Sequence, residues 1–299
     1  MRKIELIING DDFGISEEAN EAIIRAHQNG VLTSCSLMVT GDASAQAVQL
    51  ARENQKLAVG LHLVTVQGRA VLPPSDIPSI VDGNGYFSNN PTMAGVKYFL
   101  AEKARREIRR EIGAQFAKFA ATGLNFSHVD SHLHMHVNPV VFNASLEFCR
   151  RYHVNRMRVP KDDFGIAFRL DPVNAIKNAP SALIFSLLCR HMKKGLREEE
   201  FIFTDRVYGH FFTGRMSESV VLDMLGQIRA TANELYLHPA VPRGGTLLND
   251  RLIQCKKEFD ILVSREVRNR ISGLDIKLTT YSELSGLHEN QESRSQTPE

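Results

Sequence analysis

The first 63 residues alternate between short apolar runs and segments with helical spacing. The apolar runs at residues 4–9, 34–40 and 57–63 have the length and composition of buried strands. The segments between them, residues 17–30 and 42–54, repeat apolar side chains at helical intervals. Parallel strands need a long crossover connection, which is usually a helix. This alternation therefore predicts a parallel sheet that is covered by helices.

The same alternation continues over most of the chain. We expect further helices near residues 101–122, 141–152, 217–231 and 249–264, and further strands near residues 126–130, 156–160, 234–239 and 275–281. About six or seven strands in a chain of 299 residues predict the α/β class, as a single (β/α) barrel that is distorted or has fewer than eight strands. The expected barrel domain covers residues 1–285, with a helical insertion at about 162–206, and the polar residues 286–299 are expected to form a disordered tail.

Composition and charge exclude several classes of protein. A formal net charge of +2 gives no electrostatic reason to expect nucleic acid as a partner. The four cysteines lie far apart in the sequence, which excludes a zinc ribbon or a disulfide framework and favours a cytoplasmic setting. No apolar run reaches the roughly 18 residues that span a bilayer. The first residues predict a strand rather than a signal peptide.

Acids and histidines gather where the predicted strands end. Asp11 and Asp12 follow the first strand, His62 lies in the third, residues 128–136 follow a later one, and His238 ends another. In a parallel barrel these strand ends converge on one mouth. One carboxylate with two imidazoles is a suitable ligand set for a divalent ion with open positions. A second carboxylate beside the ion would suit a general base.

Each of these residues also has a purely structural explanation. The Asp pair fits a turn before a helix, His62 fits a core histidine, and His238 fits a polar strand end. The histidines at positions 132, 134 and 136 are harder to explain in this way. In an extended chain, side chains at a period of two point to the same face. We therefore expect His132, His134 and His136 to share one face at the mouth, and the whole combination to form a site.

Five segments of the chain resemble the signature segments of one family. They are IINGDDFGIS, TSCSLMVTG, VGLHL, HVDSHLHMH and ELYLHPA. They occur in the family's order, span nearly the whole chain to about residue 284, and are similar to those of the YdjC-like carbohydrate deacetylases. The resemblance implies a (β/α)-barrel hydrolase that removes the N-acetyl group from an N-acetylated sugar. It also implies one divalent metal ion, magnesium or zinc, as cofactor.

The resemblance implies a role for five residues of this chain. The second Asp of DDFG, the histidine of GLH and the first histidine after DS would be the metal ligands, here Asp12, His62 and His132. The first Asp of DDFG would be the catalytic base, here Asp11. The histidine of the HP motif, His238, would be the second catalytic residue, and we expect it to act as the acid.

Four further residues are expected around this set. Asp130, His134 and His136 are expected to orient the metal ligands or to contact the sugar. Arg158, at the end of the RMRVP segment, is expected to hydrogen-bond the substrate.

Within the family, three segments are similar to the branch associated with hopanoid biosynthesis. They are AQFAKFAATGL, ELYLHPA and GHFFTGRM. Asn138 departs from that branch, which often has a histidine there. The branch implies N-acetylglucosamine linked to a hopanoid lipid as substrate. Two alternatives stay open: a soluble chito-oligosaccharide deacetylase with the same site, and a non-catalytic module that binds sugar or metal.

The expected insertion contains the segment SALIFSLLCRHMKKGLR, residues 181–197, in which an apolar run precedes a basic cluster. Such a segment suits a helix at an anionic membrane surface or beside a lipid-linked substrate. A buried core helix with a solvated basic end is the alternative. We expect Leu183, Phe185 and Leu187 to line an apolar groove that leads to the metal, with peripheral contact at the inner face of the membrane. The sequence leaves the oligomeric state open.

Overall fold

The computed structural model describes residues 3–242, 244 and 249–284, so the expected tail at 286–299 lies outside the described residues. This part of the chain forms a seven-stranded sheet whose named pairs are all parallel. Its strands are β1 (Ile4–Phe13), β2 (Ser34–Leu37), β3 (Ala58–Leu63), β4 (Val129–Ser131), β5 (Arg206–Tyr208), β6 (Ala232–Leu237) and β7 (Ile276–Leu278). The order is β4-β3-β2-β1-β6-β5, and β7 pairs with the first residues of β1. Strand β1 has neighbours on both edges, and it is buried along almost its whole length.

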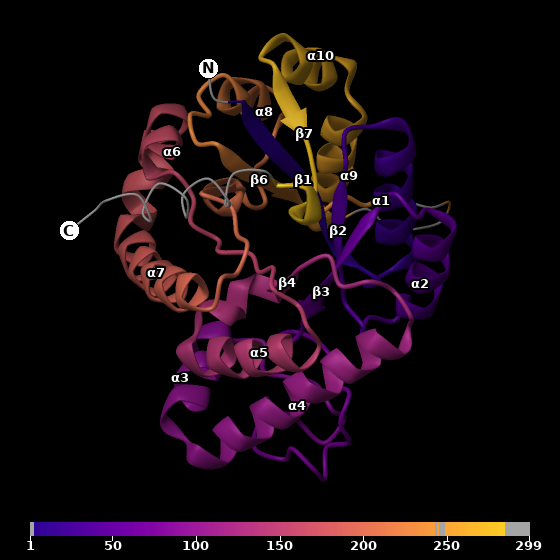
Figure 1. The fold of residues 1–299 in the computed structure, drawn as a ribbon, viewed down its shortest axis with the longest axis vertical. Helices are drawn as coiled ribbons and strands as arrows, with labels where there is room; N and C mark the ends of the chain where they lie inside the picture. Colours follow the sequence, from indigo (N-terminus) through magenta and orange to yellow (C-terminus); the bar gives the residue numbers. More distant parts are fainter. Residues whose placement is uncertain (1–2, 243, 245–248, 285–299) are drawn as a thin grey trace, which may run out of the picture.

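The helices are arranged around the strands (Figure 1). They are α1 (Glu17–Asn29), α2 (Ser44–Glu53), α3 (Pro91–Leu100), α4 (Glu102–Ala121), α5 (Pro139–Arg151), α6 (Phe164–Leu170), α7 (Pro172–Glu198), α8 (Glu218–Leu225), α9 (Asp250–Val263) and α10 (Arg265–Gly273). Three short 3₁₀ turns are η1 (His132–Val137), η2 (His210–Phe212) and η3 (Tyr281–Glu283). In Figure 1, α1 and α2 lie on one side of the sheet, α6 and α7 on the opposite side, and α4 and α5 beside β3 and β4.

The sheet curls into a distorted (β/α) barrel, which confirms the fold class expected from the sequence. Beyond β4, the curl continues through isolated bridges: Val129 pairs with Met157, and Arg156 pairs with Ile202. Shortly after Ile202 the chain enters β5, which pairs with β6 next to β1. The carboxyl ends of the parallel strands therefore face one mouth, as in other barrels of this kind.

Several expected elements differ from the structure. Residues 156–160 make bridges but no regular strand, since Pro160 has no N–H with which to continue a ladder. Strand β5 is found instead, at the end of the expected insertion, whose other regular elements are α6 and α7. The helix expected over residues 217–231 ends at Leu225, because Gly226 follows and glycine weakens a helix.

Candidate metal centre and active site

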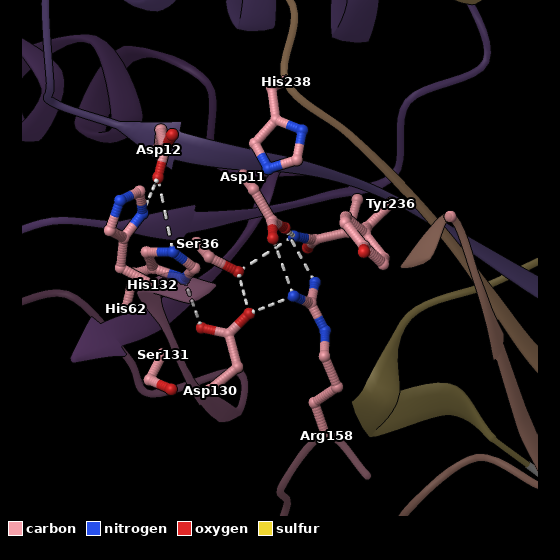
Figure 2. A network of polar contacts seen from close by, with 12 residues as sticks. Asp11, Asp12, Ser36, His62, Asp130, Ser131, His132, Arg158, Tyr236 and His238 are labelled. Atoms are coloured by element: carbon pink, nitrogen blue, oxygen red, sulfur yellow. Dashed lines mark hydrogen bonds and ion pairs between the residues drawn. The ribbon is translucent and has the colours of Figure 1, made fainter. Parts of the chain in front are cut away.

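Two adjacent carboxylates, Asp11 and Asp12, lie at the carboxyl end of β1. The pairing register of β1 with β2 shifts between Gly10 and Phe13, and Asp12 has a left-handed φ of 65°. An aspartate adopts this conformation more readily than most residues. A bulge of this kind interrupts the strict alternation of side chains along a strand. Both carboxylates therefore reach the polar cluster at the barrel mouth (Figure 2).

Asp12, His62 and His132 bring three donor groups together, as the sequence predicted. Oδ1 of Asp12 lies 2.9 Å from Nδ1 of His132 and 3.4 Å from Nε2 of His62. One donor atom from each residue lies within 4.8 Å of the others, and all three residues are buried. A carboxylate and two imidazoles with this spacing fit a divalent ion.

The charges around this donor set favour a cation. Burial lowers the pKa of His62, but the charge of Asp130 and the hydrogen bond with Asp12 outweigh it and raise that pKa to about 10. Burial raises the pKa of Asp12, but His132 and His62 hold it well below its ordinary value. In the metal-free protein a protonated imidazole therefore compensates the carboxylates, and a divalent ion would displace that proton.

Asp130 contacts His62 on the side of the ring away from Asp12, which suits a residue that orients the His62 ring. Its Oδ1 lies 2.7 Å from Nδ1 of His62, which leaves Nε2 of that ring facing Asp12. Its Oδ2 accepts a hydrogen bond of 2.8 Å from Oγ of Ser36. A carboxylate paired with a ligand histidine fixes the tautomer and the orientation of the ring.

Arg158 lies at the centre of a buried cluster of charges. It donates two hydrogen bonds of 2.8 Å to Asp11, and its nitrogens lie 2.7 Å from Asp130 and 2.6 Å from Glu234. Burial lowers the pKa of Arg158, but these three carboxylates raise it well above its ordinary value. The fully buried guanidinium thus contacts protein carboxylates, where the sequence predicted a contact with substrate.

The charges of this cluster also indicate which of two possible donor sets is the better site for a cation. Asp11, His62 and Asp130 likewise lie within 4.8 Å of one another through one donor atom each. Arg158 already compensates both carboxylates of that second set. The set that contains Asp12 is therefore the better site for a metal ion.

We predict that Arg158→Met lowers the free energy of unfolding by about 3–5 kcal/mol, since removing one partner leaves buried charges uncompensated. Arg109→Met is a matched control, because Arg109 pairs with Glu147 on the exposed surface and such a pair contributes about 0–1 kcal/mol. Urea unfolding of both variants measures the difference. An equal loss of unfolding free energy in the two variants would show that the buried cluster stabilises the fold no more than an exposed ion pair does.

The three histidines of the HLHMH segment do not share one face. The segment is the 3₁₀ turn η1, in which Leu133 and His134 have left-handed φ values of 51° and 54°. The expectation of an extended chain is wrong, because this turn sends successive side chains in different directions. Of the three rings, the one that contacts Asp12 is that of His132.

His134 and His136 occupy the space beside this centre. Nδ1 of His136 lies 2.6 Å from Oγ of Ser131, and its Nε2 lies 3.0 Å from the carbonyl oxygen of Arg158. The ring of His134 packs at right angles to Tyr236, and its Nδ1 has no hydrogen-bond partner among the described atoms. Burial lowers the pKa of His136 to about 4 and that of His134 well below its ordinary value, so both rings are neutral.

His238 lies across the mouth, directly after β6. Its Nδ1 lies 3.7 Å from Oε2 of Glu258. Burial lowers the pKa of His238, but Glu258, Asp12 and Asp11 raise it to about 9. The same histidine lines a pocket of about 280 Å³ together with both aspartates and Arg251. A protonated imidazole in a pocket with a carboxylate has the charge of a general acid.

The three side chains expected along a lipid groove lie on two faces of α7. Leu183 and Leu187, one helical turn apart, are exposed to solvent. Phe185 points the other way: its ring stacks on His210 at 4.7 Å and lies 6.1 Å from His134. Of the three, it is therefore Phe185 that adjoins the candidate site.

The residues of the site that were not predicted from the sequence include Asn9, Ser36, Glu234 and Glu258. Asn9 donates hydrogen bonds of 2.7 Å to Asp11 and 2.8 Å to Ser36. Glu234 contacts Arg158 and accepts a hydrogen bond of 2.6 Å from Tyr281. Asn9, Ser36 and Glu234 are polar residues inside buried strands, and that is the signal that could have identified them.

Comparison with known proteins places this site in an enzyme class. The chain is 31% identical to a carbohydrate deacetylase of Brevibacillus brevis, over 94% of this chain and 100% of the relative. It is 26% identical to a chitooligosaccharide deacetylase of Proteus mirabilis, over 93% of this chain and 98% of the relative. The expectation of an enzyme of the carbohydrate deacetylase class is confirmed. The model of the YdjC-like protein family matches residues 5–272, and the chain belongs to that family.

A solved structure has the same fold. A putative cellobiose-phosphate cleavage protein from Enterococcus faecalis V583 superimposes with a TM-score of 0.72 at 25% identity. The match covers 94% of this chain and 99% of the other. Among the described helices, none combines the length and the hydropathy that crossing a membrane requires.

Proposed function

We propose that this chain is a metal-dependent hydrolase that removes the N-acetyl group of an N-acetylated sugar. One observation carries the proposal: the donor set of Asp12, His62 and His132 lies at one mouth with a second carboxylate, Asp11, and a protonated histidine, His238. Amide hydrolysis needs a base for the water and an acid for the leaving amine, and these two residues would provide both. A non-catalytic binding module would need neither.

The proposed cofactor is one divalent ion, magnesium or zinc, held by Asp12, His62 and His132. Such an ion, when bound, polarises the amide carbonyl and lowers the pKa of water. Asp11 would accept the proton of the attacking water. Its Oδ2 carries a single described hydrogen bond, from Arg158, so a lone pair remains free for that proton.

Breakdown of the tetrahedral intermediate would use His238. The C–N bond breaks, the imidazolium of His238 donates its proton to the leaving nitrogen, and acetate and a free amino sugar result. Glu258 holds this proton on the ring at neutral pH, since it raises the pKa of His238. In this scheme Asp130 orients His62, and Arg158 holds Asp11 in place.

We predict that Glu258→Gln moves the alkaline limb of the pH–rate profile to lower pH. In the wild type, the acid form of His238 is lost as the pH rises through about 9. Without the charge of Glu258, the pKa of His238 should fall toward the ordinary value of about 6.5. The matched control is Asp260→Asn, because Asp260 lies on the same helix but pairs with Lys256. An unchanged alkaline limb in Glu258→Gln would remove His238 from the role of acid.

For the substrate, we propose N-acetylglucosamine linked to a hopanoid lipid, presented at the inner face of the cytoplasmic membrane. Two features support a lipid aglycone: the similarity to the hopanoid-associated branch, and the apolar surface of α7 beside the mouth. The alternative is a soluble chito-oligosaccharide, which the name of the Proteus mirabilis relative favours.

Acetate released from N-acetylglucosaminyl hopanoid and from N,N′-diacetylchitobiose, offered side by side, tests this choice. We expect the larger kcat/KM with the lipid-linked sugar. A preference for the soluble sugar would favour the chito-oligosaccharide deacetylase. No acetate from either substrate, with metal present, would contradict the proposed activity on these sugars.

A further inference from the structure

Helix α7 turns an apolar face toward solvent. Val173, Ile176, Leu183, Ile184 and Leu187 are 52–75% exposed, although large apolar side chains are usually buried. Their spacing of three, four and seven residues places them on one stripe of the helix. The opposite stripe, which includes Cys189, Met192 and Leu196, packs into the core. The exposed stripe is therefore an apolar surface that no described residue covers.

The same stripe becomes basic toward the end of the helix. Arg190, Lys194 and Arg197 continue the exposed spacing, and Glu198 is the first acidic residue on the helix. Beside them lies a hollow of about 470 Å³, which we call the basic hollow, lined by six basic residues and two acidic ones: Lys161, Arg190, Lys193, Lys194, Arg197, Arg206, Glu198 and Asp205. Among the described residues, Lys161, Arg190, Lys194 and Arg197 have no carboxylate within ion-pair distance. Burial lowers the pKa of Lys193 to about 8, and the neighbouring charge of Lys161 acts in the same direction.

We propose that the exposed stripe of α7 and the basic hollow form a docking surface for an anionic lipid bilayer. Apolar side chains beside lysine and arginine match the acyl boundary and the anionic headgroups of a bilayer, respectively. A second copy of this chain fits less well, because its own stripe presents the same positive charges. An apolar stripe along one face of a helix suits an orientation in the plane of the interface, and no described helix is both long and apolar enough to span a membrane.

Docking in this way places the catalytic mouth beside the headgroups. Helix α7 packs against η1, the turn that carries His132, and its inner side chain Phe185 lies 6.1 Å from His134. The helix is therefore a single layer between the bilayer and the site. This consequence rests on the proposed function, since a lipid-linked sugar would gain most from it. The docking itself does not depend on catalysis.

Sedimentation of the full chain with vesicles tests the proposal. We expect binding to an equal mixture of phosphatidylcholine and phosphatidylglycerol, weaker binding to phosphatidylcholine alone, and a decrease with added salt. The double variant Ile176→Glu and Ile184→Glu should bind the mixed vesicles about 100-fold more weakly, or about 10-fold for each side chain withdrawn from the interface. The double variant Lys194→Glu and Arg197→Glu should lose at least about 5-fold per residue on the mixed vesicles.

Two controls make the outcome decisive. Tyr86→Glu changes an exposed apolar residue away from α7 and should bind like the wild type. Acetate release from N,N′-diacetylchitobiose by a variant shows that its fold is intact. If the wild type released no acetate, that result would count against the proposed function and not against the docking surface. Wild-type binding by the Ile176→Glu and Ile184→Glu variant would overturn the docking surface, as would a wild type that binds no vesicles. A wild-type dimer that these two substitutions dissociate, without vesicle binding, would assign the stripe to a second copy of the chain.

Discussion

Asp11→Asn should retain the bound metal and lower kcat by about 10²–10⁴-fold, the range that general-base catalysis contributes. The amide keeps the size of the side chain but has almost no basicity, so the water loses its proton acceptor. Asp11 lies outside the preferred donor set of Asp12, His62 and His132, and metal content should therefore stay at one ion per chain. Elemental analysis and acetate release on the same sample measure both quantities.

Glu234→Gln is the matched control for this variant. Glu234 also contacts Arg158 in the buried cluster, but it is bound on its other oxygen by Tyr281, away from the mouth. We expect a much smaller effect on kcat than in Asp11→Asn. If both variants lost activity equally, Asp11 would matter as a partner of Arg158 and not as the base. Near-normal turnover in Asp11→Asn would contradict the base role directly.

His132→Ala should lose metal and activity together, because one of the three donors found among the described residues disappears. His134→Gln is the control: His134 is a buried neighbour in the same turn, but its ring contacts Tyr236 and not Asp12. Dialysed samples of both variants should therefore differ sharply in metal per chain, with the metal retained in His134→Gln. Stoichiometric metal and wild-type turnover in His132→Ala would rule out the proposed ligand set.

The donor groups of the site could be predicted because parallel strands end at one mouth. Asp12, His62 and His132 are separated by 50 and 70 residues, yet each follows or ends a strand that the apolar pattern identifies. Barrel geometry then brings them together without any knowledge of side-chain packing. The distorted barrel followed from the same alternation, since crossover helices force a parallel sheet.

The contacts of Arg158 and the shape of η1 could not be predicted. Arg158 lies in the middle of the RMRVP segment, and a sequence does not reveal that three carboxylates from other strands meet it in the interior. The turn at η1 depends on left-handed conformations at Leu133 and His134, and leucine rarely adopts that conformation. Periodicity predicted an extended chain there because it assumes a regular backbone. The error at η1 and the unforeseen contacts of Arg158 both arise where tertiary contacts override local preference.

Removal of the metal tests the central claim most directly. The chain is stripped with a chelator and dialysed, and acetate release from N,N′-diacetylchitobiose is followed while a divalent ion, magnesium or zinc, is added back. We predict no turnover in the stripped protein and a recovery that saturates at one ion per chain, as expected for the single set of Asp12, His62 and His132. Full turnover by a stripped protein of verified low metal content would contradict the account.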